Sequence, residues 1–155
     1  MSSTRRFIVA LCAVALSLTG RATSVQAQVT ILTVSGSPPP FVVSAAIAGN
    51  QPTSLSSTLS YFVKAKHPAG SQRIAAQLDS PMPAGTTLTL SMVAPPSAIS
   101  MGAVSLDMTP RDILISVDKE NGNTYGMTYV FSATVAAGVV PSQTRTVTLT
   151  MSLYP

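Results

Sequence analysis

The chain is poor in the side chains on which most enzymes depend. Its 155 residues include one Cys, one His and no Trp, and only 9% of them are charged. The single imidazole, His67, excludes a zinc site built from several histidines, and no G-x-S-x-G motif offers a nucleophile on a strand-to-helix elbow. We therefore predict a protein that is not an enzyme, with no catalytic, cofactor-binding or metal-binding residues and no cofactor.

The N-terminal segment has the pattern of a secretory signal peptide. Two arginines precede an apolar run at 7–18, and a small, polar stretch follows it. The run is about a dozen residues long, whereas a membrane span needs roughly 20. Small side chains at Val25 and Ala27 predict cleavage after Ala27, with 22–24 as a second candidate. We expect an exported protein, secreted, periplasmic or at the cell surface, with no membrane span in the mature chain.

Removing residues 1–27 changes both the charge and the cysteine content. The remaining six basic and five acidic side chains leave a net charge of +1, and no basic run remains to bind nucleic acid. Cys12 lies in the removed segment, so an exported chain without thiols must be stabilised by core packing alone. Residues 28–155 suffice for one domain with a substantial core. The predicted organisation is a signal peptide at 1–27 and one domain at 28–155.

Alternation of apolar and polar residues dominates the mature chain, and no helix is predicted. Turn residues such as Pro, Gly and Asn separate the runs. This pattern predicts an all-β fold, a single immunoglobulin-like antiparallel β-sandwich of about seven to nine strands. The predicted strands are residues 29–35, 41–48, 55–65, 73–78, 86–93, 103–108, 111–117, 124–136 and 144–154.

The phase of four runs predicts which side chains are buried. One stripe should face the core while Thr and Ser face water. The four stripes are Val147, Leu149, Met151 and Leu153; Tyr125, Met127, Tyr129, Phe131, Ala133 and Val135; Leu55, Leu59, Tyr61 and Val63; and Leu88, Leu90 and Met92.

Residues 118–123 form the sharpest local prediction, a tight hairpin turn at Asn121-Gly122. Asp118 and Glu120 suggest oxygen ligands for Ca²⁺, but their spacing does not match an EF-hand loop, so a solvated turn is favoured. The other carboxylates, Asp79, Asp107 and Asp112, fall at predicted strand ends and turns, where they increase solubility.

Two further patterns invite a binding function. The alternate threonines at 144–150 would suit ice or a crystalline polymer only if the row repeated on neighbouring strands. Because only Thr87 and Thr89 give a second, shorter row, strand propensity is the favoured explanation. Phe41, Tyr125 and Tyr154 are candidate aromatic contacts, which fall short of a site assignment.

The signal peptide, the low charge, the Thr-rich alternating runs of 28–155 and the penultimate Tyr154 resemble exported bacterial immunoglobulin-like proteins, including the pilin-like subunits of surface fibres. The resemblance implies a structural or binding role at or outside the cell surface. In one alternative, residues 29–35 are donated to a neighbouring subunit of a fibre or coat. In another, the domain binds a polysaccharide or a protein. If the sandwich is self-completed, residues 29–35 are its own first strand.

Overall fold

The structure, a computed structural model, describes residues 29–43, 50–67, 70–138 and 140–155. The expected signal peptide lies outside these residues, as does most of the predicted strand at 41–48. Within the described part, no helix is long and apolar enough to cross a membrane. Almost every element is a strand, as the alternating runs predict.

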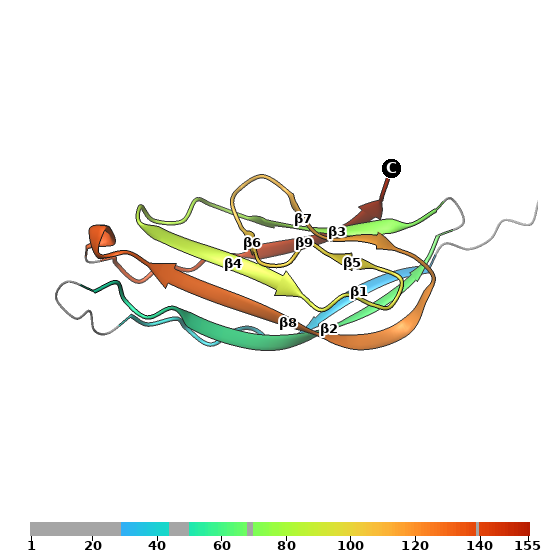
Figure 1. The fold of residues 1–155 in the computed structure, drawn as a ribbon, viewed down its shortest axis with the longest axis horizontal. Helices are drawn as coiled ribbons and strands as arrows, with labels where there is room; N and C mark the ends of the chain where they lie inside the picture. Colours follow the sequence, from blue (N-terminus) through green and yellow to red (C-terminus); the bar gives the residue numbers. More distant parts are fainter. Residues whose placement is uncertain (1–28, 44–49, 68–69, 139) are drawn as a thin grey trace, which may run out of the picture.

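Two antiparallel sheets stack as layers (Figure 1). The first has the order β1-β2-β8-β4-β6 and the second the order β5-β7-β3-β9. The prediction of an all-β fold built from two antiparallel sheets is therefore confirmed. The strands are β1 (Val29–Ser35), β2 (Leu55–Lys66), β3 (Gln72–Leu78), β4 (Thr86–Met92), β5 (Ile99–Ser100), β6 (Val104–Ser105), β7 (Arg111–Val117), β8 (Glu120–Ala133) and β9 (Val147–Leu153), with a 3₁₀ turn η1 (Val135–Ala137).

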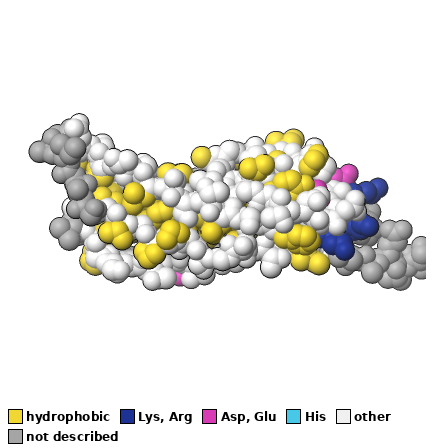
Figure 2. Space-filling view, turned by 90° about the horizontal axis from the view of Figure 1, so that it is seen from below, with side chains coloured by type: hydrophobic (Ala, Val, Ile, Leu, Met, Phe, Trp, Pro, Cys, Tyr) yellow, Lys and Arg dark blue, Asp and Glu magenta, His cyan; other side chains and the backbone are white. Residues whose placement is uncertain are grey.

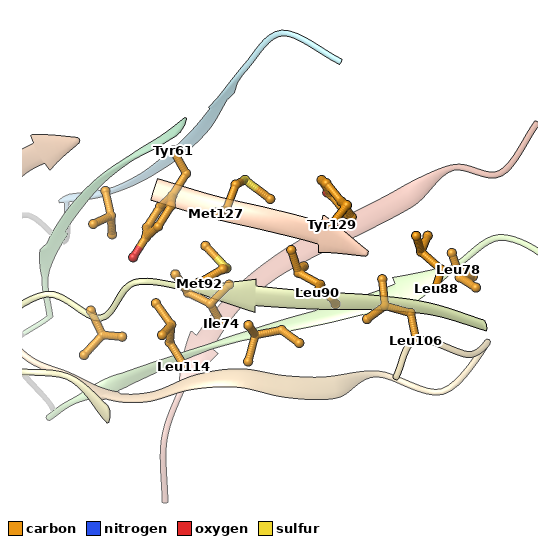
Figure 3. Close-up of a cluster of buried hydrophobic side chains, with 14 of the residues drawn as sticks. Tyr61, Ile74, Leu78, Leu88, Leu90, Met92, Leu106, Leu114, Met127 and Tyr129 are labelled. Atoms are coloured by element: carbon orange, nitrogen blue, oxygen red, sulfur yellow. The ribbon is translucent and has the colours of Figure 1, made fainter. Parts of the chain in front are cut away.

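The core lies between the two sheets and draws most of its side chains in β2, β8 and β4 from the predicted stripes (Figure 3). Val135, predicted in one of these stripes, lies instead in η1 with 55% of its surface exposed, because the strand ends at Ala133. Tyr61 on β2, Leu90 on β4 and Met127 on β8 face Ile74 and Leu114 from the second sheet, and all five are essentially inaccessible to solvent. The alternation along β9 is also confirmed for its first three apolar side chains, which pack against this core. Leu153 is an exception, with 46% of its surface exposed at the end of the strand.

β1 lies at one edge of the five-stranded sheet and pairs with β2 of the same chain along its whole length. Leu32 and Val34 point inward and pack against the core. Across the sandwich, the Gln72 side-chain amide donates to Thr30 Oγ1 at 3.1 Å. In this structure β1 completes its own sandwich, as one of the two sequence interpretations expects.

The predicted hairpin at 118–123 is wrong. β7 belongs to the four-stranded sheet and β8 to the five-stranded sheet, so Asp118 and Lys119 cross between the layers instead of closing a hairpin. Asn121 and Gly122 lie within β8, where Lys64 pairs with Asn121 and Val63 with Asn123. Gly122 is thus the extra residue of a β-bulge, and its φ of 105° is the conformation that glycine permits.

Two other predicted strands end earlier than expected. The run at 103–108 forms a strand only at β6, because Leu106 still donates to Leu88 of the first sheet while Asp107 already accepts from Leu78 of the second. The chain therefore changes sheet within this run. The run at 124–136 ends at Ala133, where the Thr134 N–H donates to Gly85 and the chain turns into η1.

Candidate functional site

The titratable side chains are dispersed over the molecule. Within the described residues, no group of three His, Cys, Asp or Glu side chains is placed to hold a metal ion. His67 directly follows β2. Asp107 pairs with Arg111, Asp112 pairs with Arg73, and both pairs are substantially exposed. These carboxylates hold basic side chains at the surface, which agrees with the solubilising role expected for them.

Glu120 lies in an environment that the sequence did not predict. It is only 5% exposed, at the start of β8, and its carboxylate accepts hydrogen bonds from the Asn123 amide and, at 3.1 Å, from the Tyr125 hydroxyl. Burial, followed by the hydrogen bond to Glu120, raises the pKa of Tyr125. Asp118 is exposed in the connection before β8. The solvated turn expected for Glu120 is therefore wrong, because its oxygens point inward to side chains of its own strand.

The three candidate aromatic contacts do not form a common site. The Phe41 ring stacks on Phe131 with centroids 6.0 Å apart, whereas Tyr125 packs beside Tyr61 at 5.8 Å. Phe131 and Tyr125 are six residues apart on β8, which corresponds to roughly 20 Å along an extended strand. Tyr154 follows β9 in the other sheet, where its N–H donates to Ser71.

The outer face of the five-stranded sheet carries rows of hydroxyl groups, which we call the hydroxyl face. The inward stripes leave alternate Ser and Thr residues of β1, β2, β8 and β4 pointing outward, and strand pairing sets them side by side. One row crosses the sheet through Thr58, Thr128 and Ser91. The hydroxyl face comprises Thr33, Ser35, Ser56, Thr58, Ser60, Thr124, Thr128, Ser132, Thr87, Thr89, Ser91 and Ser105.

The geometry of the hydroxyl face follows from the sheet. Adjacent strands lie about 4.8 Å apart, and alternate residues along a strand about 6.7 Å apart, so the hydroxyls form a two-dimensional lattice, which Gly126 and Val130 interrupt on β8. Some of them bond to one another across strands, as between Thr58 and Thr128, whose Oγ1 atoms are 3.3 Å apart. Each hydroxyl can both donate and accept a hydrogen bond. The face therefore offers many weak, uncharged contacts in a regular array.

A shallow hollow of about 350 Å³ lies where β1, β2 and β8 contribute to the hydroxyl face. An aromatic ring, Phe62, borders it, and the other lining residues are mostly hydroxylated: Thr33, Val34, Ser35, Ser60 and Thr124. The Phe62 ring lies against Gly122 of the neighbouring strand, since a Cβ built there would be 2.9 Å from its Cζ. The hollow thus combines an apolar ring with hydroxyls from β1, β2 and β8.

Charge is almost excluded from the hydroxyl face. Two cations join it, Lys64 and Lys66, and both lie at the end of β2 beside the start of β1. On the face seen from below the sandwich, the visible basic side chains lie at one end, and the middle is mostly uncharged (Figure 2). Contacts to this face therefore depend on hydrogen bonds and ring stacking much more than on ion pairs.

The row of hydroxyls that stands out in the sequence is not part of the hydroxyl face. The threonines that stand out in a linear reading, 144–150, belong to β9 and the residues before it, at the edge of the other sheet. The hydroxyl face is assembled from strands up to about a hundred residues apart, each with only a few Ser and Thr side chains. Only the pairing of β2 with β8 and of β8 with β4 brings them together.

Comparison with known proteins gives little further guidance. No protein-family model matches the chain, and no curated protein matches it. Among solved structures, the chain is similar to the CupB6 tip adhesin from Pseudomonas aeruginosa, with a TM-score of 0.45 and 16% sequence identity over 81% of this chain and 43% of that one. The chain thus spans less than half the length of that protein.

Proposed function

We propose that the protein is exported and non-enzymatic, and that it binds a neutral polysaccharide at or outside the cell surface through its hydroxyl face. Export is inferred from the N-terminal segment, and the scarcity of catalytic side chains supports a role without catalysis. The observation that carries the binding role is the uncharged array of outward hydroxyls beside the Phe62 hollow.

The chemistry of the hydroxyl face matches that of a sugar polymer. A neutral polysaccharide presents hydroxyls that both donate and accept, as the Ser and Thr side chains do. The apolar face of a sugar ring can stack on Phe62, while Ser60 and Thr124 beside it supply hydrogen bonds. An acidic polymer would find cations only at one end of the face, at Lys64 and Lys66, so charge complementarity along the rest of the face favours the neutral polymer.

Each contact in such a complex is weak. A neutral hydrogen bond contributes about 1 kcal/mol, or roughly a fivefold change in affinity, and solvent competes for it. Useful affinity therefore requires many hydroxyls to engage a polymer at once. An extended, insoluble polymer offers this multiplicity, whereas a short soluble oligosaccharide does not.

A structural role as a subunit of a fibre or coat is the second candidate. It is favoured by the open edge of β1, an uncharged strand of seven residues without proline. In the donated-strand form of that role, β1 would leave its own sheet. The pairing of β1 with β2 along its whole length, with Leu32 and Val34 in the core, supports the self-completed form instead.

Sedimentation with insoluble polysaccharides tests the binding proposal. The exported protein is mixed with cellulose, chitin and an insoluble β-glucan, and with an anionic polysaccharide gel for comparison, each at low and high salt. We expect retention on at least one neutral polymer that changes little with salt, because screening weakens ion pairs but not neutral contacts. The proposal would be overturned if none of the three neutral polymers retained the protein. It would also be overturned if the anionic gel retained the protein at low salt and released it at high salt.

Variants locate the contact surface. Thr58→Val combined with Thr128→Val removes two adjacent hydroxyls of the hydroxyl face while keeping β-branched side chains that suit a strand. Phe62→Ala removes the ring at the hollow. We expect each to reduce retention. The matched control, Thr148→Val with Thr150→Val, changes two exposed hydroxyls of β9 on the other sheet and should bind like the unaltered protein.

A further inference from the structure

The two lateral sides of the sandwich are closed in different ways. On one side the sheets end in β5 and β6, which are two residues long each. On the other side they end in β1 and β9, which are seven residues long each. The hydrogen bond from Gln72 on β3 to Thr30 on β1 places these two long edges on the same side, since β9 pairs with β3.

The β1 edge lacks the features that usually protect an edge strand. Its sequence, VTILTVS, contains neither a charged residue nor proline, and no bulge interrupts its pairing with β2. The prolines at 38–40 follow only after the strand has ended. The backbone groups that β1 directs away from β2 therefore form a regular row with no strand beside it among the described residues.

We infer that two copies of this chain pair through their β1 strands, antiparallel and edge to edge, and form a continuous ten-stranded sheet. Antiparallel pairing of identical strands is self-complementary, so a two-fold axis closes the assembly at a dimer. Full overlap of the seven residues sets Leu32 opposite Leu32 of the second copy and Ile31 opposite Thr33 of the second copy.

Ile31 is the side chain that favours β1 over β9 as the paired edge. It is a large apolar residue on the outer face of an edge strand, and 44% of its surface is exposed. In the β1 dimer it packs beside Thr33 of the second copy, which covers part of that surface. The outward residues in the middle of β9 are Thr148 and Thr150, which gain little from being covered.

The dimer also enlarges the hydroxyl face. The role of this enlarged face in binding rests on the proposed function, whereas the pairing of the two β1 strands does not. A two-fold axis perpendicular to the sheet keeps both outer faces on the same side. The Phe62 hollow borders β1, so the hollows of the two copies lie on either side of the new junction. A polymer that crosses the junction engages both faces at once, which raises avidity without any new type of contact.

Analytical ultracentrifugation of the exported protein over a range of concentrations, without polysaccharide, tests the pairing. We expect a reversible monomer–dimer equilibrium. Ile31→Lys places two like charges at diagonally neighbouring positions of the dimer, whose backbones lie about 7–8 Å apart, and should raise the dissociation constant about tenfold or more. The control Thr58→Lys puts the same charge on the same face of β2, away from the edge, and should dimerise normally. Thermal melting confirms that both variants remain folded.

A disulfide separates edge pairing from strand exchange. Ser35 pairs with Ser60, and both point outward, so cysteines at these two positions tie β1 to its own β2. Edge pairing survives this lock, whereas strand exchange does not. Three outcomes would overturn the inference. The protein could be a monomer at every concentration, or the dimer could be lost in the locked protein. In the third outcome, the dimer persists in Ile31→Lys but is lost in Leu153→Lys. Because the polysaccharide is absent, failure here is distinct from failure of the binding proposal.

Discussion

The ring of Phe62 on β2 lies directly over Gly122 of the adjacent strand β8. A Cβ at Gly122 would be 2.9 Å from the ring Cζ, closer than such contacts occur, and the φ of Gly122 is +105°. Glycine therefore serves two purposes at this position. It adopts the positive φ that the bulge requires, and its missing side chain makes room for the Phe62 ring that borders the hollow.

Gly122→Ala should destabilise the sandwich and disturb the hollow together. Positive φ and the clash with Phe62 each oppose the new methyl group, and we expect a loss of about 1–3 kcal/mol in the free energy of unfolding. Urea denaturation measures it. Gly102→Ala is the matched control, since its φ is +75° but nothing lies within 4 Å of the added Cβ. Equal losses in the two variants would show that the ring contact contributes nothing.

Gly122 also explains why the sequence predicted a hairpin at 118–123 that the structure lacks. Asn-Gly between two alternating runs indicates a hairpin turn, because both a tight turn and a bulge need positive φ. The choice between them depends on where β7 and β8 find partners. β7 pairs with β3 and β8 with β2, in different sheets. Alternation along one strand carries no information about which strand lies next to it, so burial was predicted well and pairing was not.

Thr30→Val should weaken the attachment of β1. Gln72 is only 2% exposed, and its side-chain amide donates to Thr30 Oγ1, so the variant leaves a buried donor without that acceptor. We expect a loss of about 1–3 kcal/mol in the free energy of unfolding. Combining Thr30→Val with Gln72→Leu removes both polar groups and should recover much of the loss. If the double variant is as unstable as the sum of the single changes, the hydrogen bond is not the cause.

The stability of the connection between β6 and β7 should fall in acid. The pKa of the Asp107 carboxyl lies below its ordinary value of 3.8. The carboxylate accepts hydrogen bonds from the Arg111 guanidinium and from the Thr109 N–H, and both lower the pKa. A carboxyl with a lowered pKa in the folded state stabilises it above the ordinary pKa and loses that contribution as the pH falls through the lowered value.

Asp107→Asn tests this dependence. The variant should melt at a lower temperature than the unaltered protein at neutral pH, and the difference should shrink on acidification below the ordinary carboxyl pKa of 3.8. Asp118→Asn, which changes an exposed carboxylate between β7 and β8, is the control and should retain the acid dependence of the unaltered protein. A constant difference across the pH range would exclude the ion pair with Arg111 as the cause.

The hydroxyl face was beyond the reach of sequence reasoning for a related reason. Each strand contributes only a few Ser and Thr side chains, which in isolation indicate nothing more than a solvated strand face. The lattice appears when residues as distant as Thr58 and Thr128 become neighbours. The Phe62 hollow likewise draws its lining from β1, β2 and β8. The sequence offered Phe41, Tyr125 and Tyr154 as candidate contacts instead, and the first two pack against other aromatic rings.

Alkaline conditions should destabilise the fold through Tyr61. Its hydroxyl is buried and donates to the carbonyl oxygen of Val93 at 2.6 Å. Burial raises the pKa of Tyr61 far above its ordinary value of 10.0, and the neighbouring Tyr125 and Glu120 raise it further. A raised pKa in the folded state means that Tyr61 contributes its full stability below pH 10.0 and loses it progressively at higher pH, because the unfolded chain ionises more readily.

Tyr61→Phe should therefore lower the stability near neutral pH but reduce the loss of stability at alkaline pH. Near neutral pH it removes the donor to Val93 and costs about 1 kcal/mol of the free energy of unfolding. Above pH 10.0 its stability should fall less steeply than that of the unaltered protein, because one buried hydroxyl no longer has to ionise. Tyr129, whose pKa is also raised by burial, accounts for part of the slope that remains. Urea denaturation at stepped alkaline pH measures both effects, and parallel pH profiles for the two proteins would rule out Tyr61 as the titrating group.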